Sequence, residues 1–207
     1  MPQQALIESM TNKYLLREVP PKHSLPLNPN LYQEGGGLLF IAIMARPGIS
    51  FHASQLGRRA AKLSTSNYTA ALEILQYLAT TKPLGITLRK QTHLNLNAYA
   101  DALYGGEGAR SQAGILMTLG DQPIGWYNRR QDIVSLSLTE AEYITSCEGA
   151  QNAAWAQQFL AEIGTQVQPT LTIDSEGSFN LSQTSRCLRR TRNTEHRYHY
   201  IRYRQAG

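Results

Sequence analysis

The sequence has few of the features that mark secreted, membrane-spanning or disulfide-stabilised proteins. Its two cysteines, Cys147 and Cys187, lie far apart with no C-x-x-C spacing, which argues against a disulfide framework or a structural zinc site and suits a reducing compartment. The longest apolar run, over 37–45, is far shorter than the roughly 20 residues of a membrane span. The N-terminus lacks the basic and apolar stretches of a secretory signal. We therefore expect an intracellular protein, cytoplasmic or nuclear, with no membrane partner.

Charged residues are also scarce. They make up 17% of the 207 residues, whereas apolar residues make up 42%; an average globular protein has roughly 25% charged residues. Disorder along the whole chain is excluded, because disordered chains combine few apolar residues with high net charge. The length suffices for one domain with a sizeable core, or for such a domain with an appendage.

The formal net charge of +5 is a weak indication of a polyanionic partner, but its distribution says more. Residues 186–204 hold seven arginines and one acid, Glu195, with three tyrosines between them. Arginine offers forked donors to phosphates, and aromatic rings stack on bases. Two interpretations stay open: a solvated basic tail, or a nucleic-acid-binding segment that uses Arg186, Arg189, Arg190, Arg192, Arg197 and Tyr198.

The pattern divides the chain into three parts. Residues 1–30 carry five prolines and no sustained periodicity, which predicts a poorly ordered leader or linker. Residues 31–91 show helical spacing and predict a helical connection segment. Its clearest helix follows Ser66 as N-cap and places three leucines on one face: Leu72, Leu75 and Leu78. Residues 92–207 have a different, strand-rich character.

Within 92–207, apolar and polar residues alternate over 94–100, which predicts a strand that ends at Asp101. Two further runs, over 114–119 and 124–128, flank a short turn and predict a hairpin. A fourth strand is expected over 170–174, parallel to the first.

A long helix is predicted between the third and fourth strands. Ser137-Leu138-Thr139-Glu140 has the pattern of a capping box, with Glu140 as the capping partner. Gly164 is placed to end the helix, and Gly149 is expected to bend or weaken it midway.

Three acids lie where this element order would bring carboxylates together. Asp101 and Asp174 are expected at strand ends, and Glu142 lies near the start of the long helix. Carboxylates at strand ends gather along one sheet edge, where open α/β folds bind ligands. Such a cluster needs a cation, and oxygen ligands suit Mg²⁺ or Mn²⁺. For a single acid, ordinary loop capping is the alternative interpretation.

Several motifs from about residue 31 onward resemble the end of the reverse transcriptase region and the ribonuclease H (RNase H) region of copia-type LTR retrotransposon Pol polyproteins. In the order of the chain they are Arg46-Pro47-Gly48-Ile49, Leu75-Gln76-Tyr77-Leu78, Tyr99-Ala100-Asp101-Ala102, Arg110-Ser111 with Gly114, Ile124-Gly125-Trp126, Ser135-Leu136-Ser137, Thr139-Glu140-Ala141-Glu142-Tyr143, Ile173-Asp174 and Arg197-Tyr198-His199-Tyr200-Ile201-Arg202. The Thr-Glu-Ala-Glu-Tyr motif at a helix start is the most specific of them.

The resemblance implies an α/β fold, an RNase H-like mixed sheet with flanking helices, preceded by a small helical segment. It implies metal-dependent hydrolysis of the RNA strand of RNA–DNA hybrids. Carried over residue by residue, Asp101, Glu142 and Asp174 match the catalytic carboxylates of the family. These would hold two Mg²⁺ or Mn²⁺ ions about 4 Å apart. Other parts of a Pol polyprotein are expected partners.

The sequence departs from the family pattern at several positions. Leu103, Ser175 and Glu176 stand where the family usually has an Asp, an amide residue and Gln. The last strand and helix of the family fold, which bears a fourth catalytic Asp, are expected to be missing, because the chain stops at Gly207. Glu195 is a weak candidate to replace that Asp as a metal ligand.

Two alternatives follow from these departures. A catalytically inactive RNase H-fold relic or nucleic-acid-binding module would keep the fold and lose hydrolysis. An integrase core shares the fold, but the upstream helical segment and the absence of a preceding His/Cys zinc module disfavour it. Polymerisation is excluded on this chain, because it has no Tyr-x-Asp-Asp motif.

Overall fold

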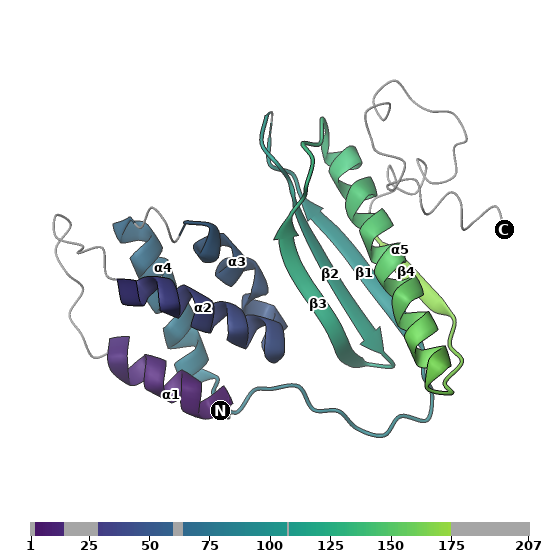
Figure 1. The fold of residues 1–207 in the computed structure, drawn as a ribbon, viewed down its shortest axis with the longest axis horizontal. Coiled ribbons are helices and arrows are strands. Elements are labelled where there is room, and N and C mark those ends of the chain that lie inside the picture. Colours follow the sequence, from purple (N-terminus) through teal and green to yellow (C-terminus); the bar gives the residue numbers. More distant parts are fainter. Residues whose placement is uncertain (1–2, 15–28, 60–63, 107, 175–207) are drawn as a thin grey trace. The chain divides into compact units, whose positions relative to one another are not determined.

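The computed structural model describes residues 3–14, 29–59, 64–106 and 108–174. They belong to two compact units that divide between Thr87 and Leu88. The first unit is helical and the second combines a sheet with one long helix (Figure 1). The helical unit comprises α1 (Gln3–Tyr14), α2 (Pro29–Met44), the short 3-10 helix η1 (Pro47–Ile49), α3 (Ser50–Arg59) and α4 (Thr65–Thr80).

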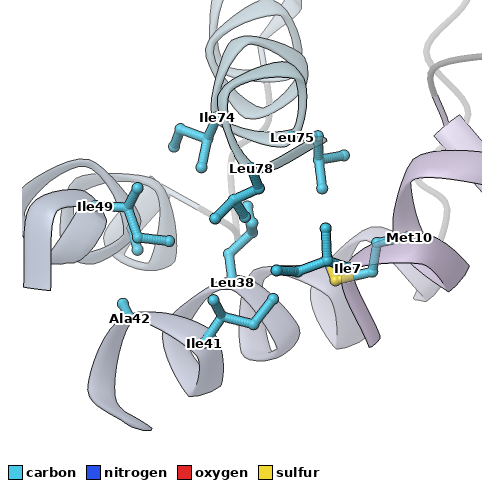
Figure 2. Packing of buried hydrophobic residues seen from close by; sticks show 10 residues of the cluster. Ile7, Met10, Leu38, Ile41, Ala42, Ile49, Ile74, Leu75 and Leu78 are labelled. Atoms are coloured by element: carbon cyan, nitrogen blue, oxygen red, sulfur yellow. The ribbon is translucent and has the colours of Figure 1, made fainter. Parts of the chain in front are cut away.

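One apolar core holds the helical unit together. Buried side chains from α1, α2, η1, α3 and α4 converge in it, and Figure 2 shows most of them. Leu75 and Leu78 are buried there, and Leu72 packs against the cluster from its edge. The leucine face predicted from helical spacing is therefore the face on which this core forms.

The structure differs from the sequence-based expectation at two places in this unit. Residues 1–30 were expected to form a poorly ordered leader, but α1 lies within them and buries Ile7 and Met10 in the core. These two buried side chains lie one turn apart, and a single pair does not make a clear periodic pattern in the sequence. Helix α4 also begins earlier than expected, because Ser64, rather than Ser66, is the N-cap and accepts a hydrogen bond from the N–H of Asn67.

Arg46 links the end of α2 to the end of α4. Its guanidinium donates to the carbonyl oxygen of Thr81 at 2.7 Å, to the hydroxyl of Thr81 at 2.8 Å and to the carbonyl oxygen of Leu84 at 2.9 Å. Thr81 is the C-cap of α4, so a buried cation satisfies acceptors at the negative end of the helix dipole. This assigns a structural role to the Arg-Pro-Gly motif.

Replacing Arg46 with alanine is expected to lower the free energy of unfolding of the helical unit by about 2 kcal/mol, because three charge-assisted hydrogen bonds to the end of α4 are lost. Arg46→Lys should recover part of the loss, since an ammonium group cannot reach all three acceptors. Urea denaturation followed by circular dichroism measures the effect. A change within about 0.5 kcal/mol, typical of surface substitutions, would contradict the assigned role.

The second unit has a four-stranded sheet in the order β3-β2-β1-β4. Its strands are β1 (Leu96–Leu103), β2 (Gln112–Leu119), β3 (Gln122–Arg130) and β4 (Pro169–Ile173). The pairs β1–β2 and β2–β3 are antiparallel, and β4 runs parallel to β1. This confirms the predicted mixed sheet, including the parallel fourth strand.

The strands of the hairpin are longer than expected, and the first strand is shifted by two residues towards the C-terminus. Leu119 pairs with Gln122, so the connecting turn is only Gly120-Asp121, and Gly120 adopts a φ of 64°. A positive φ favours glycine in a two-residue hairpin turn. Strand β1 was expected to end at Asp101 but continues to Leu103, which places Asp101 inside the strand.

Helix α5 (Leu138–Glu162) lies along one face of the sheet (Figure 1). The predicted capping box forms at its start: the hydroxyl of Ser137 accepts from the N–H of Glu140 at 3.2 Å, and the Glu140 carboxylate accepts from the N–H of Leu136 at 2.7 Å. Reciprocal bonds of this kind satisfy amides that the first helical turn leaves unpaired.

Helix α5 runs through Gly149 without interruption, and the expectation that this glycine bends or weakens the helix stays a prediction. A Cβ at this position would lie 3.1 Å from the Cβ of Ala100 and 3.1 Å from Cδ1 of Leu171. Glycine at 149 therefore permits a close approach of the helix to β1 and β4.

Within the described part of the chain, no helix is both long and apolar enough to cross a lipid bilayer.

Candidate functional site

Asp101 lies on the face of the sheet opposite to α5. Along β1, Ala98, Ala100 and Ala102 are buried, whereas Tyr99, Asp101 and Leu103 are exposed. Alternate residues of a strand point to opposite faces, and the close contact of Gly149 with Ala100 identifies the buried face as the one under α5. The Asp101 carboxylate therefore belongs to the outer face.

Asp174 is placed beside Asp101 by the parallel pairing of β4 with β1. Ala100 pairs with Ile173, and the two aspartates are the next residues on their respective chains. Neighbouring strands lie about 4.8 Å apart, so the sequence-based expectation that these two acids share one end of the sheet agrees with the register. Both residues are exposed.

Glu142 comes from α5, on the other side of β1, and is half-buried. In the residues that the structure describes, no group of three or more His, Cys, Asp or Glu side chains is close enough to hold a metal ion. The pairing of β1 with β4 thus brings Asp101 and Asp174 to neighbouring positions at one end of the sheet. The third predicted carboxylate, Glu142, comes from α5 on the opposite face. Glu195, the fourth candidate ligand, lies outside the described residues.

Basic and amide side chains border the same end of the sheet. Asp101 pairs with Gly114 and Gly114 with Asn128, so Asn128 lies in the same row on the outer face. The next row contains Gln112 and Arg130. Arg110, just before β2, is exposed, as is Arg130. Sequence analysis missed Arg130, because only the strand register places it near Asp101.

The predicted nucleic-acid-binding residues cannot be placed relative to this site. Arg186, Arg189, Arg190, Arg192, Arg197 and Tyr198 all lie outside the residues that the structure describes. Their proposed role stays a prediction.

A network of polar side chains around the buried Glu148 joins β3 to α5 on the inner face. Glu148 has a side chain only 6% exposed; its Oε2 lies 3.3 Å from Nη2 of Arg129 and accepts a hydrogen bond from the hydroxyl of Tyr127 at 3.1 Å. Asn152, one turn further along α5, donates to the Glu148 carbonyl oxygen at 2.7 Å. The Arg129 guanidinium also stacks over the Tyr127 ring, 5.1 Å from its centroid.

Sequence analysis did not identify this network. Glu148 occurs in the sequence as one acid in a mostly uncharged helix, and its spacing from other residues does not indicate a partner on a strand. A buried acid paired with an arginine fixes a helix in rotation and register, because any shift would leave the carboxylate unpaired.

Burial raises the pKa of the Tyr127 hydroxyl well above its usual value, and the negative charge of Glu148 raises it further. For Arg129, burial is the largest single influence and lowers the pKa, but the interactions with Glu148, Tyr127 and Asp132 together outweigh it, and the net shift of the pKa is upward. The network is therefore fully formed at neutral pH, with a neutral phenol and a charged guanidinium.

The free energy of unfolding should fall in alkaline solution because of Tyr127. In the unfolded chain this phenol ionises near pH 10, whereas in the folded protein it stays protonated to higher pH. The stabilisation is present below about pH 10 and is lost as pH rises from there towards the folded pKa. Tyr127→Phe should therefore flatten the curve of stability against pH above pH 10 by up to about 1.4 kcal/mol per pH unit.

Urea denaturation at pH values between 8 and about 11.5 tests this linkage. Tyr99→Phe changes a tyrosine outside the network and serves as the control. Identical alkaline slopes for Tyr127→Phe and the unmodified chain would refute the linkage.

A second polar group holds the segment between β3 and α5. The hydroxyls of Ser111 and Ser135 lie 2.6 Å apart, and the Gln131 amide donates to the carbonyl oxygen of Ala141 at 2.8 Å and to the hydroxyl of Thr145 at 2.9 Å. These five residues are all buried. This arrangement anchors the start of α5, and with it Glu142, to the end of the sheet that holds Asp101.

A hollow lies within the helical unit. It is a groove of about 570 Å³ between η1, α3 and α4. None of the predicted site residues lines it, and its walls are mostly apolar, with His52, Arg59 and Glu73 at the margin.

No known protein-family profile matches the chain. Among curated proteins it is 30% identical, over 84% of its length, to the retrovirus-related Pol polyprotein from transposon RE2 of Arabidopsis thaliana, of which it covers 12%. It is 31% identical, over 81% of its length, to the Pol polyprotein from transposon TNT 1-94 of Nicotiana tabacum, of which it covers 13%. It is 32% identical, over 70% of its length, to the putative transposon Ty5-1 protein of Saccharomyces cerevisiae, of which it covers 51%. The chain thus spans about an eighth of the length of the two Pol polyproteins.

Proposed function

Because the chain is homologous to a segment of copia-type retrotransposon Pol polyproteins, we propose that it is the RNase H-like part of such a polyprotein and binds RNA–DNA hybrids. The mixed sheet, with β4 parallel to β1 and a helix between β3 and β4, is consistent with an RNase H-like fold. The rest of a Pol polyprotein is then its natural covalent neighbour.

The observation that carries the binding proposal is the composition of the sheet end around Asp101. Arg110 and Arg130 are exposed there, and Asn128 lies in the same row as Asp101. Forked guanidinium donors and amides bind phosphate and sugar oxygens without reading sequence. The two aspartates make the charge at this end locally negative. The bound nucleic-acid strand must therefore place its phosphate backbone over the arginines.

Hydrolysis of the RNA strand would require divalent ions, Mg²⁺ or Mn²⁺, on Asp101, Glu142 and Asp174. The described arrangement does not fit such ions, since no three ligating side chains come together and Glu142 belongs to the helix on the other face of β1. Glu195 lies outside the described residues. Binding of the hybrid without cleavage by this chain alone is the function that the geometry supports best.

We expect the full chain to bind a labelled RNA–DNA hybrid at low salt, with no cleavage that depends on Asp101 in either Mg²⁺ or Mn²⁺. Asp101→Asn should bind equally well or slightly more tightly, because one charge that repels phosphates is removed. Fluorescence anisotropy measures binding, and gel analysis of end-labelled RNA measures cleavage.

The matched control is Asp121→Asn, in the hairpin turn at the opposite end of β2 and β3. It should change neither binding nor cleavage. RNA cleavage that Asp101→Asn abolishes and Asp121→Asn preserves would show that the chain is a metal-dependent nuclease and would overturn the assignment as a binding module. Absence of hybrid binding at low salt would refute both assignments, the binding module and the nuclease.

A further inference from the structure

The chain that connects the two units is apolar and open to solvent. Between α4 and β1, residues 84–91 belong to no helix, strand or turn (Figure 1). Leu84 is 54% exposed and Leu88 70%, and Ile86 between them is half-buried. None of these three side chains belongs to the apolar clusters of the described residues, so neither core needs them.

The helical unit holds this connection at Leu84. The N–H of Leu84 donates to the carbonyl oxygen of Thr81 at 3.0 Å, and its own carbonyl oxygen accepts from the guanidinium of Arg46 at 2.9 Å. Arg46 is buried and bonds to the C-cap of α4 as well. The hydrogen bonds of the helical unit therefore extend to Leu84.

The sheet unit holds the same connection at Arg89. The buried side chain of Gln122 accepts from the N–H of Arg89 at 2.7 Å and donates to the carbonyl oxygen of Arg89 at 2.8 Å. One amide thus pairs both main-chain groups of a residue, as a neighbouring strand would. The side chain of Gln91 donates to Asp121 in the hairpin turn. From Arg89 onward the connection is attached to the β2–β3 hairpin.

Residues 85–88 lie between these two attachments, and the boundary between the two units falls among them, after Thr87. In the part of the chain that the structure describes, no hydrogen bond joins these residues to any other. An endopeptidase needs a stretch of chain that is separated from its neighbours, so a bond within a helix or a sheet is cut only after local opening, which costs free energy. Residues 85–88 need no such opening.

We propose that residues 85–88 are a proteolytic processing site, at which an endopeptidase with apolar subsites separates the helical unit from the sheet unit. Leu84, Ile86 and Leu88 alternate, so an extended chain presents them on one side to such subsites. Hydrolysis breaks the C–N bond between Thr87 and Leu88. The oxygen of a water molecule joins the carbonyl carbon of Thr87, which becomes a carboxylate, and Leu88 keeps the nitrogen as a new ammonium terminus.

The position of the cut leaves both products intact. The bonds of Arg46 to Leu84 stay in the helical product, and those of Gln122 to Arg89 stay in the sheet product. Each product also keeps its own apolar clusters. The proposal does not depend on the binding of RNA–DNA hybrids.

Limited digestion of the full chain with thermolysin, which cuts before apolar residues, tests the site. Among bonds within the described residues, we expect the first cut before Ile86 or Leu88, as identified by mass spectrometry, with no loss of far-ultraviolet circular dichroism. Leu136 is 63% exposed, nearly as much as Leu88, but its N–H is bound by Glu140. The bond before Leu136 should therefore be cut at least about tenfold more slowly.

Replacing Ile86 and Leu88 together with aspartate should abolish the first cut, whereas Leu136→Asp, the matched control, should leave it unchanged. An earlier cut before Leu136, or products that lose their circular dichroism once residues 85–88 are cut, would overturn the proposal.

Trypsin tests where the site ends. The bond after Arg89 should be cut slowly in the unmodified chain, because both main-chain groups of Arg89 are held by Gln122. Gln122→Ala should raise this rate about tenfold or more, since two hydrogen bonds are removed. Cutting after the exposed Arg110 in the same digest is the internal reference and should not change. An equal rate after Arg89 in both chains would refute Gln122 as the limit of the site.

Discussion

Arg129→Met is expected to lower the free energy of unfolding of the sheet unit by about 3 kcal/mol. Glu148 is almost completely buried and Arg129 is its cation. Removing one partner of a buried pair leaves an uncompensated charge, which typically destabilises a protein by about 3–5 kcal/mol. We expect the lower end, because the Arg129 side chain is 55% exposed and solvent screens part of the interaction.

The pair is measured with a double-mutant cycle by urea denaturation. Glu148→Gln alone should cost about 1 kcal/mol, since a neutral amide can still accept from Tyr127 and Arg129 can turn to water. The double variant should be more stable than Arg129→Met alone, which gives a coupling energy of about 1–2 kcal/mol. Arg130→Met, at the adjacent exposed position, is the matched control. Equal losses for Arg129→Met and Arg130→Met would contradict the network.

Replacing Arg189, Arg190 and Arg192 together with alanine is expected to weaken hybrid binding strongly and to flatten its salt dependence. Each arginine that neutralises a phosphate releases counterions and contributes about 0.7–0.9 to the slope of log affinity against log salt. If all three contact phosphates, the slope falls by about two to three units. These residues lie outside the described part of the chain, so the expectation rests on the sequence alone.

The described residues provide an internal comparison for this experiment. Arg110→Ala with Arg130→Ala should lower the slope by up to about two units if the sheet end around Asp101 contacts the backbone. Anisotropy titrations at several salt concentrations measure both variants. An unchanged slope for the triple variant would leave residues 186–204 as solvated surface, and an unchanged slope for Arg110 and Arg130 would remove the sheet end from the interface.

Local patterns were sufficient for most of the secondary structure. The alternation over 94–100, the Gly120-Asp121 turn and the Ser137–Glu140 capping box each correspond to an observed element, because each depends on residues that are neighbours in the chain. The same reasoning did not predict α1, which buries Ile7 and Met10, and it did not reveal the close approach of Gly149 to the distant Ala100.

The candidate site was predictable only in part. The sequence led to Asp101 and Asp174, and strand pairing places them together. It did not reveal on which face of β1 Asp101 lies relative to α5, since a shift of one residue in a strand moves a side chain to the other face. Arg130 and Asn128 were missed for the same reason, because two successive strand registers place them near Asp101.

What the sequence determined by itself is the set of elements, their order and the relationship to retrotransposon Pol polyproteins, since these follow from the spacing and identity of neighbouring residues. Only the tertiary structure decided which charges are paired and which apolar residues are buried. The network joins Glu148 on α5 to Arg129 and Tyr127 on β3, and the exposed residues Trp155, Phe159 and Ile163 lie further along the same helix. The physical reason is that α5 mixes apolar, amide and acidic residues, so its sequence does not indicate which side the sheet covers; in the fold, Gly149 lies on the side that closely approaches β1.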